Sequence, residues 1–295
     1  MSRSQEPATA LFTGAAGNRL VADVFGEEGP PVLLLHGGGQ TRHSWRATAE
    51  HIVESGSVAY ALDQRGHGDS DWIADGSYAF SDFAEDVSAV AEALAARTGT
   101  APVVIGASLG GIASLLAAGA AAKAGRPPLF SALILVDITP RVEPEGVSRV
   151  QGFMRAHAAE GFGSIAEAAA TVAAYLPHRP QPRSHEGLKK NLRLDPDGRW
   201  RWHWDPRFLD GPRPVGTARA DTEDALVDAA KRITMPAMLV RGTSSELVKE
   251  AHVREFLDLV PHAEYIDVAG ARHMVAGDRN DRFSAAILSF LGKLG

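Results

Sequence analysis

The stretch Val103-Val104-Ile105-Gly106-Ala107-Ser108-Leu109-Gly110-Gly111 decides how this sequence folds. An apolar, β-branched run ends at Ile105 and an alanine-rich helical pattern begins at Leu109, so Ser108 stands at a sharp turn from strand to helix. Glycines two residues on either side of the serine relieve crowding against neighbouring backbone. Unpaired N–H groups at the start of the helix face any developing negative charge. The pattern predicts a nucleophilic serine.

Outward from this turn, leucine-rich or β-branched runs alternate with helical stretches, which is typical of a parallel sheet covered by helices on both faces. The sequence therefore predicts an α/β fold with a mostly parallel, twisted sheet. The predicted strands are Leu20–Phe25, Val32–Leu35, Val58–Leu62, Val103–Ile105, Leu133–Val136, Ala237–Val240 and Tyr265–Val268. The predicted helices are Ser44–Ser55, Phe80–Arg97, Leu109–Lys123, Leu247–Leu259 and Arg279–Leu291.

The alternation stops in residues 143–217. This stretch shows no clear strand, and its helical pieces are 146–161 and 165–175. Because strands and helices alternate again after it, the simplest interpretation is an insertion after one strand of the sheet. We predict a core of residues 1–142 and 218–295 that carries residues 143–217 as a helical cap.

A glycine loop, Leu35-His36-Gly37-Gly38-Gly39-Gln40, follows another predicted strand. Backbone N–H groups of such a loop approach a substrate oxygen closely because glycine has no side chain. The N–H groups of Gly38 and Leu109 are the predicted oxyanion hole, and Gly39 is the rival donor, one residue away.

A serine nucleophile needs a general base, and His273 stands just after the last predicted strand, where a loop at the carboxyl end of the sheet can present it to Ser108. Two acids follow predicted strands and could orient the histidine. Glu246 follows Ala237–Val240, and Asp137 ends Leu133–Val136. We favour Glu246 as the acid and keep Asp137 as its rival.

With these residues in place, the chain resembles the α/β-hydrolase superfamily over nearly its whole length. The segments that carry the resemblance are His36-Gly37-Gly38, Asp63-Gln64-Arg65-Gly66-His67-Gly68-Asp69-Ser70, the Ser108 turn, and His273 with Met274 to Asp278. The resemblance implies a serine hydrolase that acts through an acyl-enzyme, with serine, acid and histidine in that chain order. It also implies that Arg65 to Ser70 is a structural turn beside the site. The family more often has Asp at the acid position where this chain has Glu246.

Aromatic residues of the predicted cap are candidates for substrate selection. Trp200, Trp202 and Trp204 alternate, so in a strand they would share one face. Aromatic side chains bring a large apolar area with few rotatable bonds, which suits a bulky apolar substrate. The alternative interpretation is that they pack the cap onto the core. The predicted pocket residues are His36, Gly39, Tyr175, Trp200, Trp202 and Trp204.

We expect a hydrolase of a small-molecule carboxylic ester or lactone, with no cofactor. A macrocyclic lactone such as a macrolide antibiotic is one such substrate. A carbon–carbon bond hydrolase and a cofactor-free perhydrolase use the same residues and remain alternatives. A ligand receptor with slow turnover on the same fold is the alternative from another class.

Composition excludes several other classes. The chain has 295 residues, 45% hydrophobic and 22% charged, with a net charge of −6 and no clustered basic face, which argues against nucleic acid as a partner. It has no cysteine, hence no disulfide, thiol nucleophile or thiolate-bound metal. We predict no metal, because zinc-type spacings are missing and the turn motif explains Asp63, His67 and Asp69. The apolar stretch at Ile112–Ala122 is far short of the roughly 20 residues that span a bilayer. We therefore expect a cytoplasmic protein without membrane contact. The sequence does not indicate which oligomeric state the protein adopts.

Overall fold

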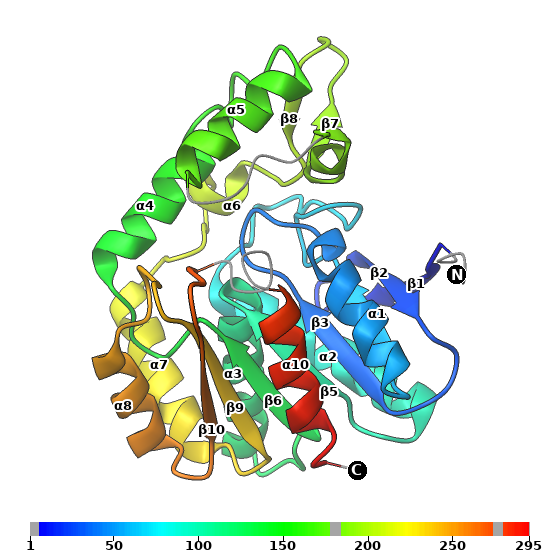
Figure 1. The fold of residues 1–295 in the computed structure, drawn as a ribbon, viewed down its shortest axis with the longest axis vertical. Helices are drawn as coiled ribbons and strands as arrows, with labels where there is room; N and C mark the ends of the chain where they lie inside the picture. The colour runs from blue at the N-terminus through cyan, green and yellow to red at the C-terminus, as the bar shows by residue number, and fades with distance from the viewer. Residues whose placement is uncertain (1–5, 178–183, 274–279, 295) are drawn as a thin grey trace.

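An eight-stranded sheet lies at the centre of the molecule, which the computed structural model describes for residues 6–177, 184–273 and 280–294 (Figure 1). The strand order is β1-β2-β4-β3-β5-β6-β9-β10. Only the pairs β1–β2 and β2–β4 are antiparallel, so the predicted mostly parallel sheet is confirmed. The strands are β1 (Ala8–Thr13), β2 (Arg19–Phe25), β3 (Pro31–Leu35), β4 (Val58–Leu62), β5 (Val103–Ala107), β6 (Ala132–Val136), β9 (Ala237–Gly242) and β10 (Glu264–Val268).

Helices cover both faces of the sheet, as the buried apolar strands require. Alternate side chains of β3 point to opposite faces, so Leu33 and Leu35 pack in one core and Val32 and Leu34 in the other. The first core includes residues of α2, α3, α7 and α8, and the second includes residues of α1 and α10. The bounds are α1 (Arg46–Glu54), α2 (Phe80–Thr98), α3 (Leu109–Lys123), α7 (Arg219–Arg232), α8 (Glu250–Leu259) and α10 (Asn280–Leu291).

All seven predicted strands are present, but two elements of the core were not predicted. The first, β1, is an edge strand that buries only Ala10 and Phe12, so its apolar pattern is weak. The second, α7, is rich in charged residues and buries only a narrow stripe of its surface. In both cases tertiary packing stabilises an element whose own sequence gives little signal.

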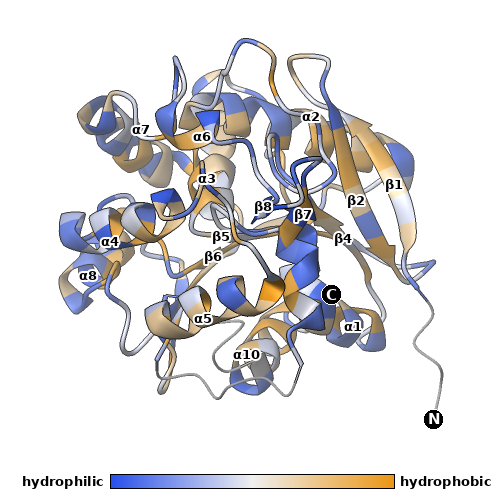
Figure 2. Cartoon of the chain, turned by 90° about the horizontal axis from the view of Figure 1, so that it is seen from above, coloured by the Kyte–Doolittle hydropathy of each residue, from blue (hydrophilic) through white to orange (hydrophobic). Residues whose placement is uncertain are grey.

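The segment between β6 and α7 lies above the ends of the strands, around β5 and β6 in the view from above (Figures 1 and 2). Its elements are α4 (Pro144–Arg155), α5 (Ile165–Tyr175), the 3-10 helix η2 (Glu186–Asn191), β7 (Leu192–Leu194), β8 (Trp200–Trp202) and α6 (Arg207–Asp210). We call residues 143–217 the inserted segment. The expectation that it has no strand is wrong, because β7 and β8 form an antiparallel pair. Strands of three residues are too short for alternation to show in a sequence.

The predicted helix 146–161 ends earlier, since α4 stops at Arg155, whereas α5 has the predicted bounds. Figure 2 shows hydrophilic and hydrophobic residues mixed along α4, as in a helix with one side against the protein and the other in solvent. Within the described ranges, no helix is long and apolar enough to cross a bilayer. The Met274–Asp278 part of the predicted motif, and Arg279 at the predicted helix start, lie outside the described residues.

Candidate active site

Ser108 lies at the turn between β5 and α3 with φ 46° and ψ −110°, a backbone conformation that is costly for a residue with a side chain. The flanking glycines make this turn possible by close approach. A Cβ on Gly106 would come within 2.6 Å of the Gly110 carbonyl carbon, and one on Gly110 within 2.5 Å of the Leu35 carbonyl oxygen. The predicted strand-to-helix turn is confirmed, and Ser108 lines a cavity beneath the inserted segment.

Asp137 directly follows β6 and is fully buried. Its Oδ1 accepts a hydrogen bond from the backbone N–H of Gly242 at 3.0 Å. Its Oδ2 accepts from the Ser245 hydroxyl at 2.6 Å and pairs with Nδ1 of His273 at 2.8 Å. Because Nδ1–H donates to a carboxylate that is itself fixed from two sides, the His273 ring is held with Nε2 as its remaining nitrogen. His273 lines the same cavity as Ser108.

The preference for Glu246 as the acid that orients His273 is wrong. The strands β6 and β9 are parallel neighbours, and the backbone N–H of Asp137 donates to Val240, so Asp137 lies at the sheet edge itself. Glu246 stands four residues beyond the end of β9, where Ser245 takes the position that faces Asp137. Glu246 lines the cavity, and the hydrogen bond of His273 Nδ1 goes to Asp137 instead.

The glycine loop after β3 distinguishes the two rival N–H donors. The N–H of Gly39 donates to Nε2 of His67 at 3.1 Å and is therefore already engaged. No acceptor for the N–H groups of Gly38 or Leu109 is found in the described part of the chain. These two groups belong to residues that line the cavity beside Ser108, so the geometry favours Gly38 over Gly39 as an oxyanion donor.

Two buried histidines, 5.1 Å apart between ring centroids, brace this loop. His36 interacts with the Gly37 carbonyl through Nδ1 and accepts from the Gln64 N–H at Nε2. His67 interacts with the Arg65 carbonyl through Nδ1 while it accepts from the glycine loop. Burial lowers the pKa of His36 to about 4 and that of His67 to about 3, so both rings are neutral hydrogen-bonding groups. The prediction that His36 lines the pocket is wrong, because its ring is fully buried below the loop.

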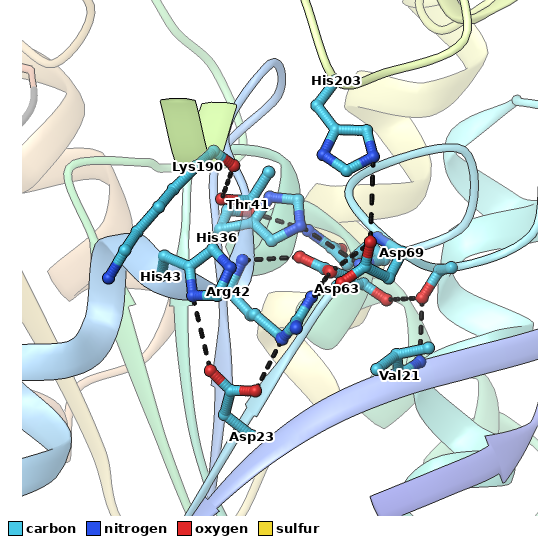
Figure 3. Close-up of polar contacts among 12 residues, drawn as sticks. Val21, Asp23, His36, Thr41, Arg42, His43, Asp63, Asp69, Lys190 and His203 are labelled. Carbon is cyan, nitrogen blue, oxygen red and sulfur yellow. Dashed lines mark hydrogen bonds and ion pairs between the residues drawn. The ribbon is translucent and has the colours of Figure 1, made fainter. Parts of the chain in front are cut away.

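Arg42 anchors the chain just beyond the glycine loop (Figure 3). Its guanidinium group contacts the carboxylates of Asp23, Asp63 and Asp69, two of which belong to the motif after β4. Thr41 donates to the Lys190 carbonyl at 3.2 Å, which connects the same loop to the inserted segment. The aspartates of the turn thus bind an arginine. Among the residues with described positions, no three His, Asp or Glu side chains are grouped as a metal site needs.

The cavity between the sheet and the inserted segment has a volume of about 1030 Å³. Gly39, Tyr175, Trp202 and Trp204 line it, as predicted. Trp200 is absent from its lining, so this part of the pocket prediction is wrong, and the Trp200 backbone pairs with Phe162. Other large apolar side chains of the wall include Trp45, Phe80, Phe153, Met154 and Phe208.

The comparison with known proteins agrees with this arrangement. A sequence profile of the α/β hydrolase fold matches residues 30–279. This chain belongs to the α/β-hydrolase family. It is 31% identical over 260 residues to the esterase Rv0045c of Mycobacterium tuberculosis, across 86% of this chain and 80% of that protein. It is also 31% identical over 260 residues to the 2-(acetamidomethylene)succinate hydrolase of Mesorhizobium japonicum, across 84% and 82%. The crystal structure of an E-2-(acetamidomethylene)succinate hydrolase matches this α/β hydrolase with a TM-score of 0.82 at 25% identity, covering 97% of this chain and 99% of that one.

Several residues that shape the site of this α/β hydrolase were not predicted from the sequence. Ser245 holds Asp137, His67 holds the glycine loop, and Phe208 packs against the His67 ring at 4.9 Å between centroids. The family motif gave a signal for His67, as part of a turn beside the site. Ser245 and Phe208 gave none, because each acts through a neighbour that only folding brings close.

Proposed function

We propose that this α/β hydrolase is a serine hydrolase of carboxylic esters or lactones. The observation that carries the proposal is the buried Asp137, which holds His273 by a 2.8 Å hydrogen bond on the wall of the cavity that Ser108 also lines. The similarity to a mycobacterial esterase supports ester hydrolysis as the reaction.

Nε2 of His273 takes the proton of the Ser108 hydroxyl while the oxygen attacks the ester carbonyl, and Asp137 stabilises the imidazolium. The N–H groups of Gly38 and Leu109 bind the resulting oxyanion, and each such donor contributes about 3 kcal/mol to transition-state stabilisation. The imidazolium then protonates the leaving alkoxide. A water molecule, deprotonated by the same histidine, releases the acid from the acyl-enzyme.

We further propose that residues 143–217 act as the cap that selects the substrate. Its aromatic wall and the volume of about 1030 Å³ favour a bulky, largely apolar molecule, since pockets for drug-sized ligands hold roughly 300–1,000 Å³. A macrocyclic lactone such as a macrolide antibiotic fits this description. A small acetate ester would leave most of the wall without contact.

Intact-mass measurement after incubation with a fluorophosphonate tests the nucleophile. We expect one adduct on the wild-type protein and none on Ser108→Ala. Hydrolysis rates across p-nitrophenyl acetate, butyrate and octanoate and a macrocyclic lactone then test the cap, and we expect rates to rise with the size of the acyl group. No adduct on the folded wild type would overturn the serine mechanism and favour a ligand receptor. A clear preference for acetate would overturn the selection of bulky substrates.

A further inference from the structure

Glu246 lies on the cavity wall but is not part of the hydrogen-bonded group formed by Asp137 and His273. Its backbone is fixed on both sides. The Ser245 hydroxyl, which donates to Asp137, accepts from the two backbone N–H groups that follow Glu246 at 3.1 and 3.0 Å. The Glu246 carbonyl lies against α4, where a Cβ on Gly146 would come within 2.3 Å of it. These contacts fix the backbone of Glu246, which directly follows Ser245, the residue that donates to Asp137.

The carboxylate of Glu246 has no partner in the part of the chain that the structure describes, and its Oε2 is buried. The other acidic residue of the wall, Glu223, accepts a hydrogen bond from Arg219 at 2.9 Å. The remaining arginines of the wall are engaged elsewhere, because Arg155 binds an aspartate of α6 and Arg272 has an interaction of its own. Glu246 is thus an uncompensated negative charge at the edge of an apolar cavity.

Such a charge is unfavourable without a partner, because the buried Oε2 loses its hydration and no hydrogen bond replaces it. A bound molecule that supplies a positive charge would reverse this loss. The surroundings are suited to a cation as well. Phe153 and Tyr175 line the cavity with their rings stacked at 4.0 Å between centroids, and aromatic rings attract cations. Burial raises the pKa of Tyr175, and the negative charge of Glu246 adds to this shift, so the Tyr175 hydroxyl stays neutral in this part of the cavity.

We propose that Glu246 is a specificity-determining residue that binds a protonated amine of the substrate. This hydrolase would then prefer esters or lactones that carry one cationic nitrogen on an otherwise apolar body. The inference rests on the proposed function, because the amine would bind in the cavity where Ser108 attacks the carbonyl. A site built for such a contact rejects molecules that lack it, because the carboxylate with its buried Oε2 is then left unpaired.

Competitive inhibition of the hydrolysis of p-nitrophenyl butyrate, a neutral ester, tests this assignment. The inhibitors are hexylamine (a cation at neutral pH), 1-hexanol and hexanoate, and the uncatalysed reaction is subtracted. For the wild type we expect hexylamine to bind at least about 10-fold more tightly than hexanol. In Glu246→Gln the inhibition constant of hexylamine should rise by about 10-fold while that of hexanol changes by less than about 2-fold. Glu223→Gln is the matched control, since it removes a wall carboxylate that already has a partner, and it should leave both constants unchanged.

Equal inhibition constants for hexylamine in the wild type and Glu246→Gln would overturn the proposal. Equal weakening of hexylamine and hexanol in Glu246→Gln would also overturn it, because the glutamate would then bind a neutral donor. The thermal midpoint of Glu246→Gln should equal or exceed that of the wild type, since an unpaired charge is removed.

The failure of this inference can be separated from the failure of the proposed function. Fluorophosphonate labelling of Ser108 tests the nucleophile without reference to Glu246. Binding of hexylamine can also be followed by tryptophan fluorescence, because Trp202 and Trp204 line the cavity. Binding that depends on Glu246 in a protein without labelling would support the amine site and reject the hydrolase. Labelling of Ser108 without selective binding of hexylamine would support the hydrolase and reject the amine site.

Discussion

The floor of the cavity, at the ends of β3, β5, β6 and β9, and its roof, formed by α4 and α5, are held by different forces. In the floor, hydrogen bonds from backbone and buried side chains fix Asp137 and the glycine loop. In the roof, α4 buries only Gly146 and Met154 and α5 buries only Ala168. We therefore expect substitutions in the floor to disturb the geometry of the site, and substitutions in the roof to have modest effects on folding. Under the proposed function, the chemistry would depend on the floor and the choice of substrate on the roof.

The largest effect should come from Ser108→Ala. Loss of the nucleophile is expected to lower kcat for ester hydrolysis by at least about 10⁴-fold, since only binding and the oxyanion donors remain. Steady-state rates on p-nitrophenyl butyrate and the thermal midpoint measure this. The midpoint should stay within a few degrees of the wild type, because the change removes one small, half-buried hydroxyl group. Residual activity within about 10-fold of the wild type would mean that another group is the nucleophile.

Asp137→Asn should have the next largest effect, with kcat lowered by about 10³- to 10⁴-fold. The amide fits the same space but no longer stabilises the imidazolium of His273. Glu246→Gln is the matched carboxylate-to-amide change, and on a neutral ester it should alter kcat by less than about 3-fold. The ratio of the loss of kcat in Asp137→Asn to that in Glu246→Gln measures how much more the reaction depends on the floor of the cavity than on its wall. Similar losses in both variants would contradict the assignment of Asp137.

His67 should make the floor sensitive to acid. Its folded pKa of about 3 lies below its ordinary value of 6.5, so at intermediate pH the unfolded chain binds more protons and stability falls as pH is lowered. At about 1.4 kcal/mol per pH unit, moving from pH 6.5 to about pH 5 removes about 2 kcal/mol for this ring. His67→Gln keeps an acceptor for Gly39 and does not titrate. Urea unfolding at about pH 7.5 and pH 5 should show an acid-induced loss smaller by about 2 kcal/mol in the variant. An identical loss in both proteins would show that His67 is already charged in the folded state.

Phe153→Ala should have the smallest effect and should change selection. Phe153 lines the roof and stacks on Tyr175, so its removal takes apolar contact area from long acyl chains. We expect kcat/KM for p-nitrophenyl octanoate to fall by about 10-fold and that for the acetate to change by less than about 2-fold. Leu194→Ala is the control, because Leu194 is exposed on β7 and does not line the cavity. Equal losses of kcat/KM on the octanoate and the acetate would show that Phe153 supports the structure of the floor and does not select the substrate.

The sequence predicted most of the sheet and the serine turn because these features are local. A strand buried on both faces appears as a short apolar run, and a turn that needs glycine at fixed distances from Ser108 shows those glycines directly. Elements with a weak local sequence pattern were not predicted. The edge strand β1 and the charged helix α7 give little signal of their own, and the hairpin of β7 and β8 is too short to show a period.

Residues adjacent in the chain were enough to predict the family of the fold, the turn that carries Ser108 and the position of the histidine after the last strand. The folded chain was needed to identify Asp137 instead of Glu246 as the partner of His273, and to favour Gly38 over Gly39 as an oxyanion donor. The first choice depends on the alignment of β6 with β9 and on where the turn after β9 places Ser245. The second depends on a hydrogen bond from Gly39 to His67, 28 residues away. Contacts between distant segments leave no trace in local patterns, because neither partner requires the other until the chain has folded.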